Sequence, residues 1–306
     1  MATNPDALKL KGSRPSPPVH GMKLDMLRLI RPARSPRSGA SAAPAATTVP
    51  TMTRTRNDGR ALTTRAVVLL TATIMPARNS DNLIIKDPTE RLSQYIQGFS
   101  SALSMSRSVV RGVIFAENSG ADLGVFAELA SGREDVELLS YNSTGDGSEG
   151  RGYLETRLVI DAMRDSKILA SQPTVIWKVT GRYRVRNLIR LMQRVPPSKD
   201  LYFNLRRWPY EWADMWVYGA TLPGLALLEK TLEPLRQDRG QPAELALFKV
   251  LRNLEQSGEP ISLRFPVEPR ISGIRGFDGK SYDSPSQVAK WAIRSVARRV
   301  AGGLWI

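Results

Sequence analysis

The stretch Ala66-Val-Val-Leu-Leu-Thr-Ala-Thr-Ile-Met75 decides the fold of this chain. It is a continuous apolar run rich in β-branched residues, and Pro76 closes it, a pattern typical of a strand buried on both faces. It is also the longest apolar run, about half of the ~20 residues that a membrane-spanning helix needs. The run therefore predicts the first strand of a buried sheet and no integral membrane protein.

Helices and strands alternate after this run. Asp87-Pro88-Thr89-Glu90 combines an N-cap acid with a proline at the first helical position, and it opens a helix that runs to Ser104. Apolar patterns predict strands at 109–116, 136–141 and 174–180, and helices at 122–131 and 152–169. This alternation predicts a single α/β domain over residues 63–284, with a mostly parallel central sheet and a ligand at the carboxyl ends of its strands.

Polar residues follow the first two predicted strands. Thr71, Thr73 and Pro76 lie at the end of the first strand, and the second runs into Glu117-Asn118-Ser119-Gly120. A glycine-rich loop, Gly145 to Gly152, enters the helix at 152–169, where free N–H groups favour a phosphate. A flexible surface loop explains the same glycines equally well.

The strand at 174–180 has the richest polar end. Because side chains alternate along a strand, Lys178, Thr180 and Arg182 share one face, and Gly181 permits a close backbone approach. This arrangement suits an anionic diphosphate. A solvated basic strand end is the competing interpretation.

Composition excludes several chemistries. The chain has no cysteine, so it has no disulfide, no Cys-ligated metal and no thiolate nucleophile. Its one histidine, His20, lies in a proline-rich stretch, which excludes a folded Ser-His-Asp triad and a multi-histidine metal site. Any catalytic base must therefore be a carboxylate, a lysine or a tyrosine.

The positive charge is concentrated at the N-terminus. The first 65 residues hold twelve basic and three acidic side chains, which is +9 of the formal net charge of +15. Residues 1–62 are rich in Pro, Ser and Arg and are predicted to be disordered. Three interpretations of this segment stay open: a transit-like peptide, an arm attracted to nucleic acid or membrane, or untranslated sequence upstream of a start at Met52. The rest of the chain carries +6, an ordinary value for an enzyme of anionic ligands.

Five motifs follow one another along the chain in a set order: Leu69–Pro76, Asp87–Arg91, Glu117–Gly120, Gly150–Glu155 and Lys178–Arg182. Together they resemble a family of small bacterial glycosyltransferases of surface-polysaccharide synthesis (lipopolysaccharide or capsule). Their patterns there are Leu-Leu-Thr-x-x-Ile-x-Pro, Asp-Pro-x-x-Arg, Glu-Asn-Ser/Thr-Gly, Gly-Lys-Gly-x-x-Glu and Lys-x-Thr-Gly-Arg. Arg151 departs from the family's Lys. The resemblance covers about residues 66–280, more loosely at Asp214–Thr221 and Pro269–Gly276.

The resemblance implies a GT-A-like fold, of Rossmann-like type, and a nucleotide-sugar donor. The residues expected to bind the donor are Thr71, Thr73, Pro76, Asn118, Gly120, Gly150, Arg151, Gly152, Lys178, Thr180, Gly181 and Arg182. No Asp-x-Asp follows residue 62, so we predict no divalent metal and no cofactor. Fixed cations would then neutralise the leaving group, and the candidates are Lys178, Arg182 and the late-loop residues Arg270 and Arg275, near Gly273.

A transfer with inversion needs a carboxylate to accept the proton of the acceptor hydroxyl. Asp214 is the first candidate because it adjoins the aromatic segment 201–216, and Glu155 or Glu117 is the second. Structural roles compete with these assignments: Glu117 could cap a neighbouring turn, and Glu155 could pair with Arg151 one helical turn earlier. The aromatic residues of 201–216 suit either an acceptor-binding wall or core packing.

The C-terminal segment 285–306 predicts a basic amphipathic helix. Lys290, Arg294 and Arg298 recur on one side, and Ala289, Ile293, Val296 and Val300 line the other. Two interpretations stay open: contact with an anionic membrane through Trp291 or Trp305, or docking against the α/β domain. The first suits a lipid-linked acceptor, and it places the protein in the cytoplasm at the inner face of the plasma membrane.

Two other functional classes remain as alternatives. One is a basic nucleic-acid-binding protein, which is disfavoured because the folded part is nearly balanced in charge and shows no recognisable module, so we expect no nucleic-acid partner. The other is a nucleotide-binding protein that has lost catalysis. The predicted partners are therefore a nucleotide sugar and a glycan or lipid-linked acceptor.

Overall fold

The computed structural model describes residues 66–77, 83–145, 148–170, 175–237, 241–276 and 278–300. All of them belong to one compact unit, Gly59–Ile306. The segment 1–62, predicted to be disordered, lies outside the described residues, as does Thr174, the first residue predicted for the fourth strand.

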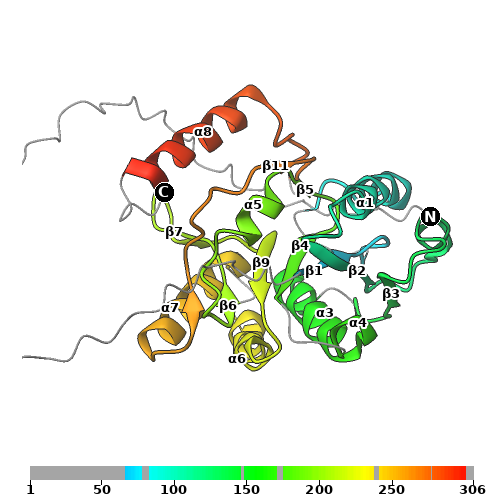
Figure 1. Cartoon of the computed structure of the whole chain (residues 1–306), viewed down its shortest axis with the longest axis horizontal. Coiled ribbons are helices and arrows are strands. Elements are labelled where there is room, and N and C mark those ends of the chain that lie inside the picture. The colour runs from blue at the N-terminus through cyan, green and yellow to red at the C-terminus, as the bar shows by residue number, and fades with distance from the viewer. Residues whose placement is uncertain are drawn as a thin grey trace, which may run out of the picture. The chain divides into compact units, whose positions relative to one another are not determined.

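A seven-stranded sheet forms the centre of the unit (Figure 1). Its strand order is β10-β6-β9-β4-β1-β2-β3, from Ile261–Ser262, Leu201–Tyr202, Val217–Ala220, Ile176–Thr180, Ala66–Ala72, Val110–Glu117 and Val136–Ser140. Only β9 runs antiparallel to its neighbours, β4 and β6. The predicted fold class, α/β with a mostly parallel sheet, is confirmed.

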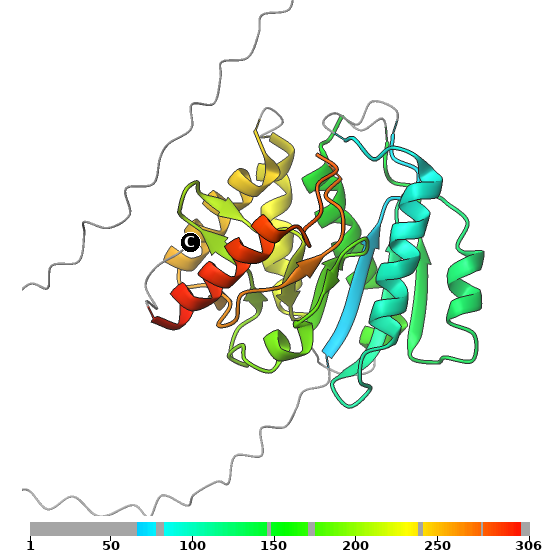
Figure 2. The ribbon, with the colours of Figure 1, turned by 90° about the horizontal axis from the view of Figure 1, so that it is seen from above.

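Helices cover both faces of the sheet (Figure 2). On one face, α3 (Arg151–Asp165), α6 (Gly224–Gln237) and α7 (Ala243–Gln256) pack against side chains such as Val67 and Leu69 of β1. On the other face, α1 (Pro88–Leu103), α2 (Gly124–Leu129) and α5 (Leu188–Met192) pack against Val68 and Leu70. Since every residue of β1 is buried, its continuous apolar run follows from burial on two faces.

Local signals explain where several elements begin and end. The Asp87 side chain accepts a hydrogen bond from the backbone N–H of Glu90 at 2.8 Å, which caps α1 as predicted. The helix predicted at 152–169 is two helices, α3 and α4 (Lys167–Ala170). Ser166 is extended between them, and its hydroxyl donates to Oε2 of Glu137 at 2.5 Å. The Glu137 carboxylate also accepts from the backbone N–H of Lys167 at 3.1 Å, a donor that a continuous helix would use, so the break between α3 and α4 coincides with this contact.

The sheet reverses its winding between β1 and β4. The chain passes from β1 to β2 and β3 on one side, then returns through α3 to β4 on the other side of β1. In open α/β sheets, ligands bind in the crevice at such a reversal, outside the carboxyl ends of the strands. The ends of β1 and β4 are therefore the first place to look for a site.

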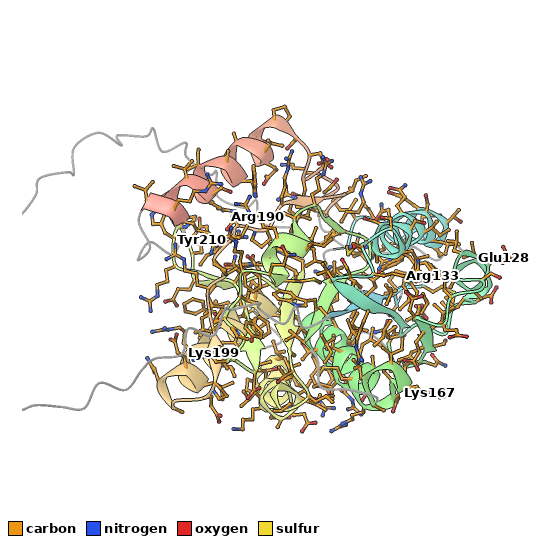
Figure 3. The ribbon with its side chains drawn as sticks, in the orientation of Figure 1. Glu128, Arg133, Lys167, Arg190, Lys199 and Tyr210 are labelled. Atoms are coloured by element: carbon orange, nitrogen blue, oxygen red, sulfur yellow. The ribbon has the colours of Figure 1, made fainter. Side chains whose placement is uncertain are left out.

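Smaller elements complete the unit. β5 (Arg184–Val185) pairs with β11 (Ile271–Ser272), and β7 (Leu205–Arg206) forms a hairpin with β8 (Trp212–Ala213). The helix predicted near the C-terminus is α8 (Pro285–Val300), while residues 301–306 lie outside the described part. Figure 3 shows Glu128, Lys167 and Tyr210 at the periphery of the molecule. Among the residues that the structure describes, no helix combines the length and apolar character that crossing a bilayer requires.

Candidate active site at the carboxyl ends of the strands

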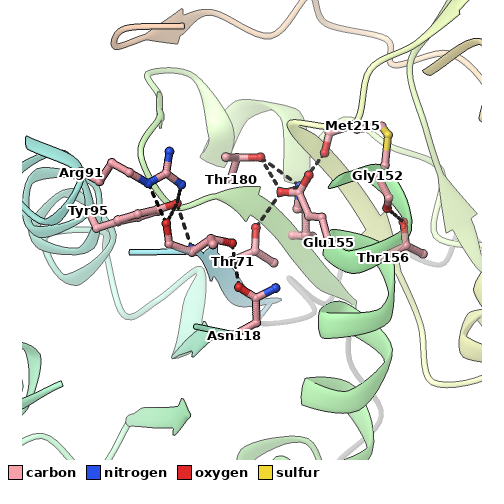
Figure 4. Close-up of polar contacts among 11 residues, drawn as sticks. Thr71, Arg91, Tyr95, Asn118, Gly152, Glu155, Thr156, Thr180 and Met215 are labelled. Atoms are coloured by element: carbon pink, nitrogen blue, oxygen red, sulfur yellow. Dashed lines mark hydrogen bonds and ion pairs between the residues drawn. The ribbon is translucent and has the colours of Figure 1, made fainter. Parts of the chain in front are cut away.

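Lys178 and Glu155 form an ion pair at the reversal point (Figure 4). The Nζ of Lys178 donates to Oε1 of Glu155 at 2.6 Å, to the Thr180 hydroxyl at 3.0 Å and to the backbone carbonyl of Met215 at 2.6 Å. The hydroxyls of Thr71 and Thr180 donate to the same Glu155 oxygen, at 2.8 and 2.9 Å. Two strands, β1 and β4, thus converge on the carboxylate that α3 carries.

This cluster fixes the protonation state of Glu155. Burial by itself would raise the pKa of Glu155, but the charge of Lys178 and the hydrogen bonds around Oε1 outweigh it, and the pKa lies below its usual range. The side chain is still 27% exposed, and Oε2 makes no hydrogen bond to any described residue. Glu155 therefore presents one ionised, free oxygen at the reversal point.

Lys178 is placed differently from a phosphate-binding lysine. Its side chain is only 1% exposed, and all three ammonium protons have acceptors within the fold. In this conformation it holds Glu155 and leaves no proton for a diphosphate. The predicted alternation is correct for Lys178 and Thr180, which share one face, but Glu155 occupies that face. It is wrong for Arg182, which follows the end of β4 and contacts α1.

Gly181 accommodates a helix. A Cβ at Gly98 of α1 would lie 1.8 Å from the carbonyl oxygen of Gly181, and a Cβ at Gly181 would lie 2.9 Å from that of Thr71. The close backbone approach that the sequence predicts is therefore used by α1. Arg182, next in the chain, is half-buried and donates to Gln94 of the same helix at 3.3 Å.

Glu117 is a structural residue. It is fully buried, and its carboxylate accepts from the backbone N–H groups of Ile74 at 2.9 Å, Ser119 at 2.9 Å and Ala121 at 3.1 Å, as well as from the Ser119 hydroxyl. Such a carboxylate ties the loop after β1 to the loop after β2 and has no free oxygen for proton transfer. The turn-capping interpretation of Glu117 is correct.

The remaining residues of these two strand ends form a second polar group. The hydroxyl of Thr73 donates to Oδ1 of the buried Asn118 at 2.7 Å (Figure 4). Gly120 has a positive φ of 69° in the turn that follows. Pro76 is half-buried beside the exposed Met75.

Arg91 and Tyr95 hold the loop after β1 from α1. Arg91 is 4% exposed, and its guanidinium donates to the carbonyls of Thr73 at 2.7 Å and Ile85 at 3.2 Å and to the Tyr95 hydroxyl at 3.0 Å. Burial lowers the pKa of Arg91, an effect that the Tyr95 contact partly offsets. The Asp-Pro-x-x-Arg motif is thus a brace for Thr73.

The two glycines at the start of α3 have different roles: Gly150 forms the turn before the helix, and Gly152 allows close packing. Gly150 adopts a φ of 83° just before the helix, and Arg151 is exposed. Gly152 is buried, and a Cβ there would lie 2.1 Å from that of Ala243, so this glycine lets α3 and α7 touch. Glu155 pairs with Lys178 and makes no ion pair with Arg151, so the competing helical pairing is wrong.

Asp214 lies just before β9, at the same edge of the sheet. Its Oδ2 accepts from Nδ2 of Asn204 at 2.6 Å and from the Arg206 guanidinium at 2.8 Å. Its Oδ1 is buried and has no hydrogen-bond partner among the residues that the structure describes. Asp214 is 0% exposed in this conformation, and a carboxylate oxygen buried without a partner is costly, which makes Oδ1 a candidate for contact with a ligand or a water molecule.

Asp214 lines a cleft of about 280 Å³. The cleft also holds Glu244, whose pKa is raised by burial and by the nearby charge of Glu155. Its basic side chains include Arg206, Arg270, Arg275, Lys290 and Arg294, and its aromatic ones Trp212, Trp216, Tyr282 and Trp291. Cations and aromatic faces around a carboxylate suit a ligand with both phosphate and sugar.

The late loop contributes two arginines to this cleft. Arg270 lies over the ring of Trp291, 5.0 Å from its centre, and Arg275 pairs with Asp278 at 2.6 Å. Gly273 has a φ of 132°, and a Cβ there would lie 3.1 Å from the carbonyl oxygen of Arg182. The loop therefore closes over the strand end that carries Arg182, and its glycine is required there.

α8 turns Arg294 and Arg298 inward, while Lys290 and Arg299 are exposed. Arg298 is 5% exposed and donates to Glu268 at 2.7 Å, to the Phe265 carbonyl at 2.5 Å and to Oδ1 of Asn204 at 2.7 Å. The Trp291 indole donates to the Glu268 carbonyl at 3.1 Å. Docking against the α/β domain is therefore observed for α8, and Trp291 takes part in it through its indole N–H. Contact of this helix with a membrane stays a prediction.

The aromatic segment 201–216 divides three ways. Tyr202 and Phe203 are fully buried, as core packing predicts. Trp212 and Trp216 line the cleft, which agrees with an aromatic wall. The other two aromatic residues, Trp208 and Tyr210, lie in the tip of the β7–β8 hairpin and are 64% and 77% exposed.

No protein-family model and no curated protein matches the chain. Solved structures do. WbbM, a bifunctional glycosyltransferase, is 10% identical with a TM-score of 0.39, over 65% of this chain and 38% of that one. GlyE of Streptococcus pneumoniae, a glycosyltransferase, is 10% identical with a TM-score of 0.41, and the match covers 65% of this chain and 45% of GlyE. A cytidylyltransferase of Leptospira borgpetersenii is 16% identical with a TM-score of 0.39, and the match covers 73% of this chain and 83% of the cytidylyltransferase. The chain thus spans less than half of the first two, and we derive its function from its own residues.

Several site residues escape sequence reasoning. Asn204, just before β7, and Arg206, in β7, bind Asp214, which lies ten and eight residues later. Their spacing of two, which suits one face of an extended segment, is the only sequence signal for them. Glu244 reaches the cleft from the start of α7, and no pattern in the sequence marks it.

Metal ligands are a separate question. In the described ranges, no group of three or more His, Asp or Glu side chains is arranged to hold a metal ion. Independence from metal stays a prediction, as does the absence of a cofactor.

Proposed function

We propose that this protein is a glycosyltransferase that moves a sugar from a nucleotide-sugar donor to a glycan or lipid-linked acceptor in bacterial surface-polysaccharide synthesis. One observation carries the proposal. Four of the five family-like motifs, ending in Pro76, Gly120, Glu155 and Arg182, meet at the carboxyl ends of β1, β2 and β4, where the sheet reverses. The fifth, at Asp87–Arg91, braces that same edge.

The donor fits the crevice between β1 and β4 in this proposal. The free Oε2 of Glu155 would accept a hydrogen bond from a sugar or ribose hydroxyl, with Thr73 and Asn118 beside it. The leaving diphosphate would face the cations of the adjoining cleft, which are Arg270 and Arg275 together with Lys290 and Arg294. Of these, Arg270, Lys290 and Arg294 make no ion pair with any described carboxylate.

Asp214 is the proposed base. In a transfer with inversion, the acceptor hydroxyl would donate to Oδ1 while its oxygen attacks the anomeric carbon of the donor sugar. The bond from that carbon to the diphosphate oxygen breaks, the nucleoside diphosphate leaves with the electron pair, and Asp214 holds the proton. Asn204 and Arg206 would fix the carboxylate through Oδ2 and leave Oδ1, which has no described partner, to accept from the acceptor once that oxygen is opened to the cleft.

A nucleotide screen tests the donor. We expect UDP, GDP, CMP or dTDP sugars, tried one by one, to include one class that raises the melting temperature. Glu155→Gln should weaken this shift, whereas Glu128→Gln, an exposed substitution on α2, should leave it unchanged. A shift with no sugar transfer would favour the inactive nucleotide-binding alternative, and no shift with any nucleotide would refute the transferase.

A pair of isosteric variants tests the base. Asp214→Asn should lower the transfer rate by roughly 10²–10⁴-fold with donor binding retained. Glu244→Gln, in the same cleft, is the matched control. If Glu244→Gln abolishes transfer and Asp214→Asn does not, the base is Glu244. Its raised pKa would make it a stronger proton acceptor than an ordinary carboxylate.

A peripheral contact with an anionic membrane belongs to the same proposal, because a lipid-linked acceptor would be presented at such a surface. It would place the protein in the cytoplasm, at the inner face of the plasma membrane. When cells are fractionated, we expect the protein to sediment with the membrane pellet and to be released from it by salt.

A further inference from the structure

The outward side of α8 is apolar. Ala289, Ile293, Val296 and Val300 are spaced by four, three and four residues, so they form one stripe along the helix. Ile293, Val296 and Val300 are 65%, 58% and 80% exposed. An exposed aliphatic stripe on the outside of a folded unit is unusual and marks an interaction surface.

The polar contacts beneath α8 prevent the helix from rolling to bury this stripe. Arg298 is held by Glu268, Asn204 and the Phe265 carbonyl, and Trp291 by the Glu268 carbonyl. Rolling the helix would break the buried Arg298–Glu268 pair, in which both side chains are at most 5% exposed. The contacts of Arg298 and Trp291 therefore keep the stripe on the outside, and no described residue covers it.

The tip of the β7–β8 hairpin adds two aromatic residues. Trp208 and Tyr210 are 64% and 77% exposed, and with Ile293 and Val300 they are the four most exposed large hydrophobic side chains among the described residues. The hairpin and α8 lie side by side in Figures 1 and 2, and the hydrogen bond from Arg298 to Asn204 joins them. We call Trp208, Tyr210, Ile293, Val296 and Val300 the outer patch.

Charge decides which partner fits the outer patch. α8 carries four basic residues and no acidic one, and Lys290 and Arg299 are exposed beside the stripe. A second copy of the chain would bring like charges together. An anionic bilayer offers the opposite charge, an apolar interior for the aliphatic side chains and an interfacial zone for Trp and Tyr.

We propose that the outer patch docks on an anionic lipid surface, with the aliphatic stripe of α8 and the hairpin tip entering the headgroup region. The sequence left open which side of α8 would meet a membrane, and the structure leaves the apolar side exposed. The inner side of α8 lines the cleft of Asp214, so docking would bring that cleft to the bilayer. The inference rests on the membrane contact in the proposed function, but lipid binding by the outer patch is measured without any sugar transfer, so the two can fail separately.

The absence of cysteine makes a direct test available. Val296→Cys or Tyr210→Cys in the full chain gives a single site for an environment-sensitive NBD label, and Leu129→Cys on α2, 41% exposed, is the matched control. With vesicles of phosphatidylcholine and phosphatidylglycerol, we expect a blue shift and increased emission at the first two sites and none at the control. Vesicles of phosphatidylcholine alone should give a much smaller response.

Substitution gives the second readout. In vesicle flotation, Ile293→Ser combined with Val296→Ser should lower the partition coefficient at least about tenfold, with an unchanged melting temperature. Leu129→Ser should not change it. Flotation without an NBD response at either patch site would assign binding to another part of the chain and overturn the proposal. Concentration-dependent dimerisation that the double substitution abolishes would overturn it in favour of a second copy.

Discussion

Replacing Lys178 by Met removes the ammonium group that holds Glu155 while keeping most of the volume and the apolar stem. The substitution abolishes three hydrogen bonds, to Glu155, to the Thr180 hydroxyl and to the Met215 carbonyl. It leaves a carboxylate that is only 27% exposed without its counter-charge. The fold should survive, since methionine keeps the apolar stem in this central strand, but at a measurable loss of stability.

The magnitude follows from the burial of the pair. Removing one partner of a buried ion pair costs about 3–5 kcal/mol, because the other charge stays uncompensated. Glu155 retains some contact with water, so we expect a loss near the lower end, about 3 kcal/mol. Lys167→Met, an exposed substitution on α4, should change the free energy of unfolding by less than about 0.5 kcal/mol.

The loss should depend on pH in a defined direction. In the native protein the pKa of Glu155 is lowered, so its pairing stabilises the fold above the carboxyl pKa of the unfolded chain and is lost as pH falls through the folded pKa. Without Lys178, burial raises the pKa of Glu155. The free-energy cost of the unpaired carboxylate then decreases as pH falls, because the group becomes protonated. Urea unfolding followed by circular dichroism should therefore show a smaller difference in the free energy of unfolding between wild type and variant at about pH 5 than at about pH 8.

A double variant separates the pair from general damage. Lys178→Met with Glu155→Gln removes the stranded charge, so it should be more stable than Lys178→Met alone by about 1–2 kcal/mol. If the double variant is no more stable than the single one, and the gap does not narrow with falling pH, the reasoning about Glu155 is wrong.

Three further predictions concern structural contacts. Glu117→Gln should lower the free energy of unfolding by about 1–3 kcal/mol, measured by urea titration, because an amide N–H₂ would face backbone N–H donors; a loss of transfer without destabilisation would contradict this role. Arg298→Met should detach α8, seen as faster hydrogen exchange over 285–300, whereas exposed Arg299→Met should not; equal exchange in both variants would count against the buried pair. Gly98→Ala should cost roughly 1–3 kcal/mol, measured by thermal unfolding against Ser93→Ala, because the new Cβ would meet the Gly181 carbonyl; an unchanged melting temperature would refute the close approach.

The fold class could be predicted from local patterns. The run at 66–75 reports burial on two faces, and Asp87-Pro88 reports a helix start, because each signal needs only near neighbours in the chain. The break at Ser166 could not be predicted in the same way, since the contact that coincides with it is made by Glu137, 29 residues earlier.

The site residues were partly predicted. Strand ends point to Thr71, Glu117 and Lys178, because carboxyl ends of parallel strands meet at one edge. Their roles depend on partners that the pattern does not give. The Glu117 carboxylate accepts hydrogen bonds from backbone N–H groups, and the Lys178 ammonium pairs with Glu155, 23 residues away.

The sequence by itself determined the alternation of helices and strands, the polar strand ends and the amphipathic character of α8. Only the tertiary structure decided which side of α8 faces inward. Amphipathicity states that a helix has two unlike sides, but burial of Arg298 requires acceptors that surround it, here Glu268, Asn204 and the Phe265 carbonyl. Because those acceptors come from distant segments, the apolar side is outside, against the usual expectation from hydrophobicity alone.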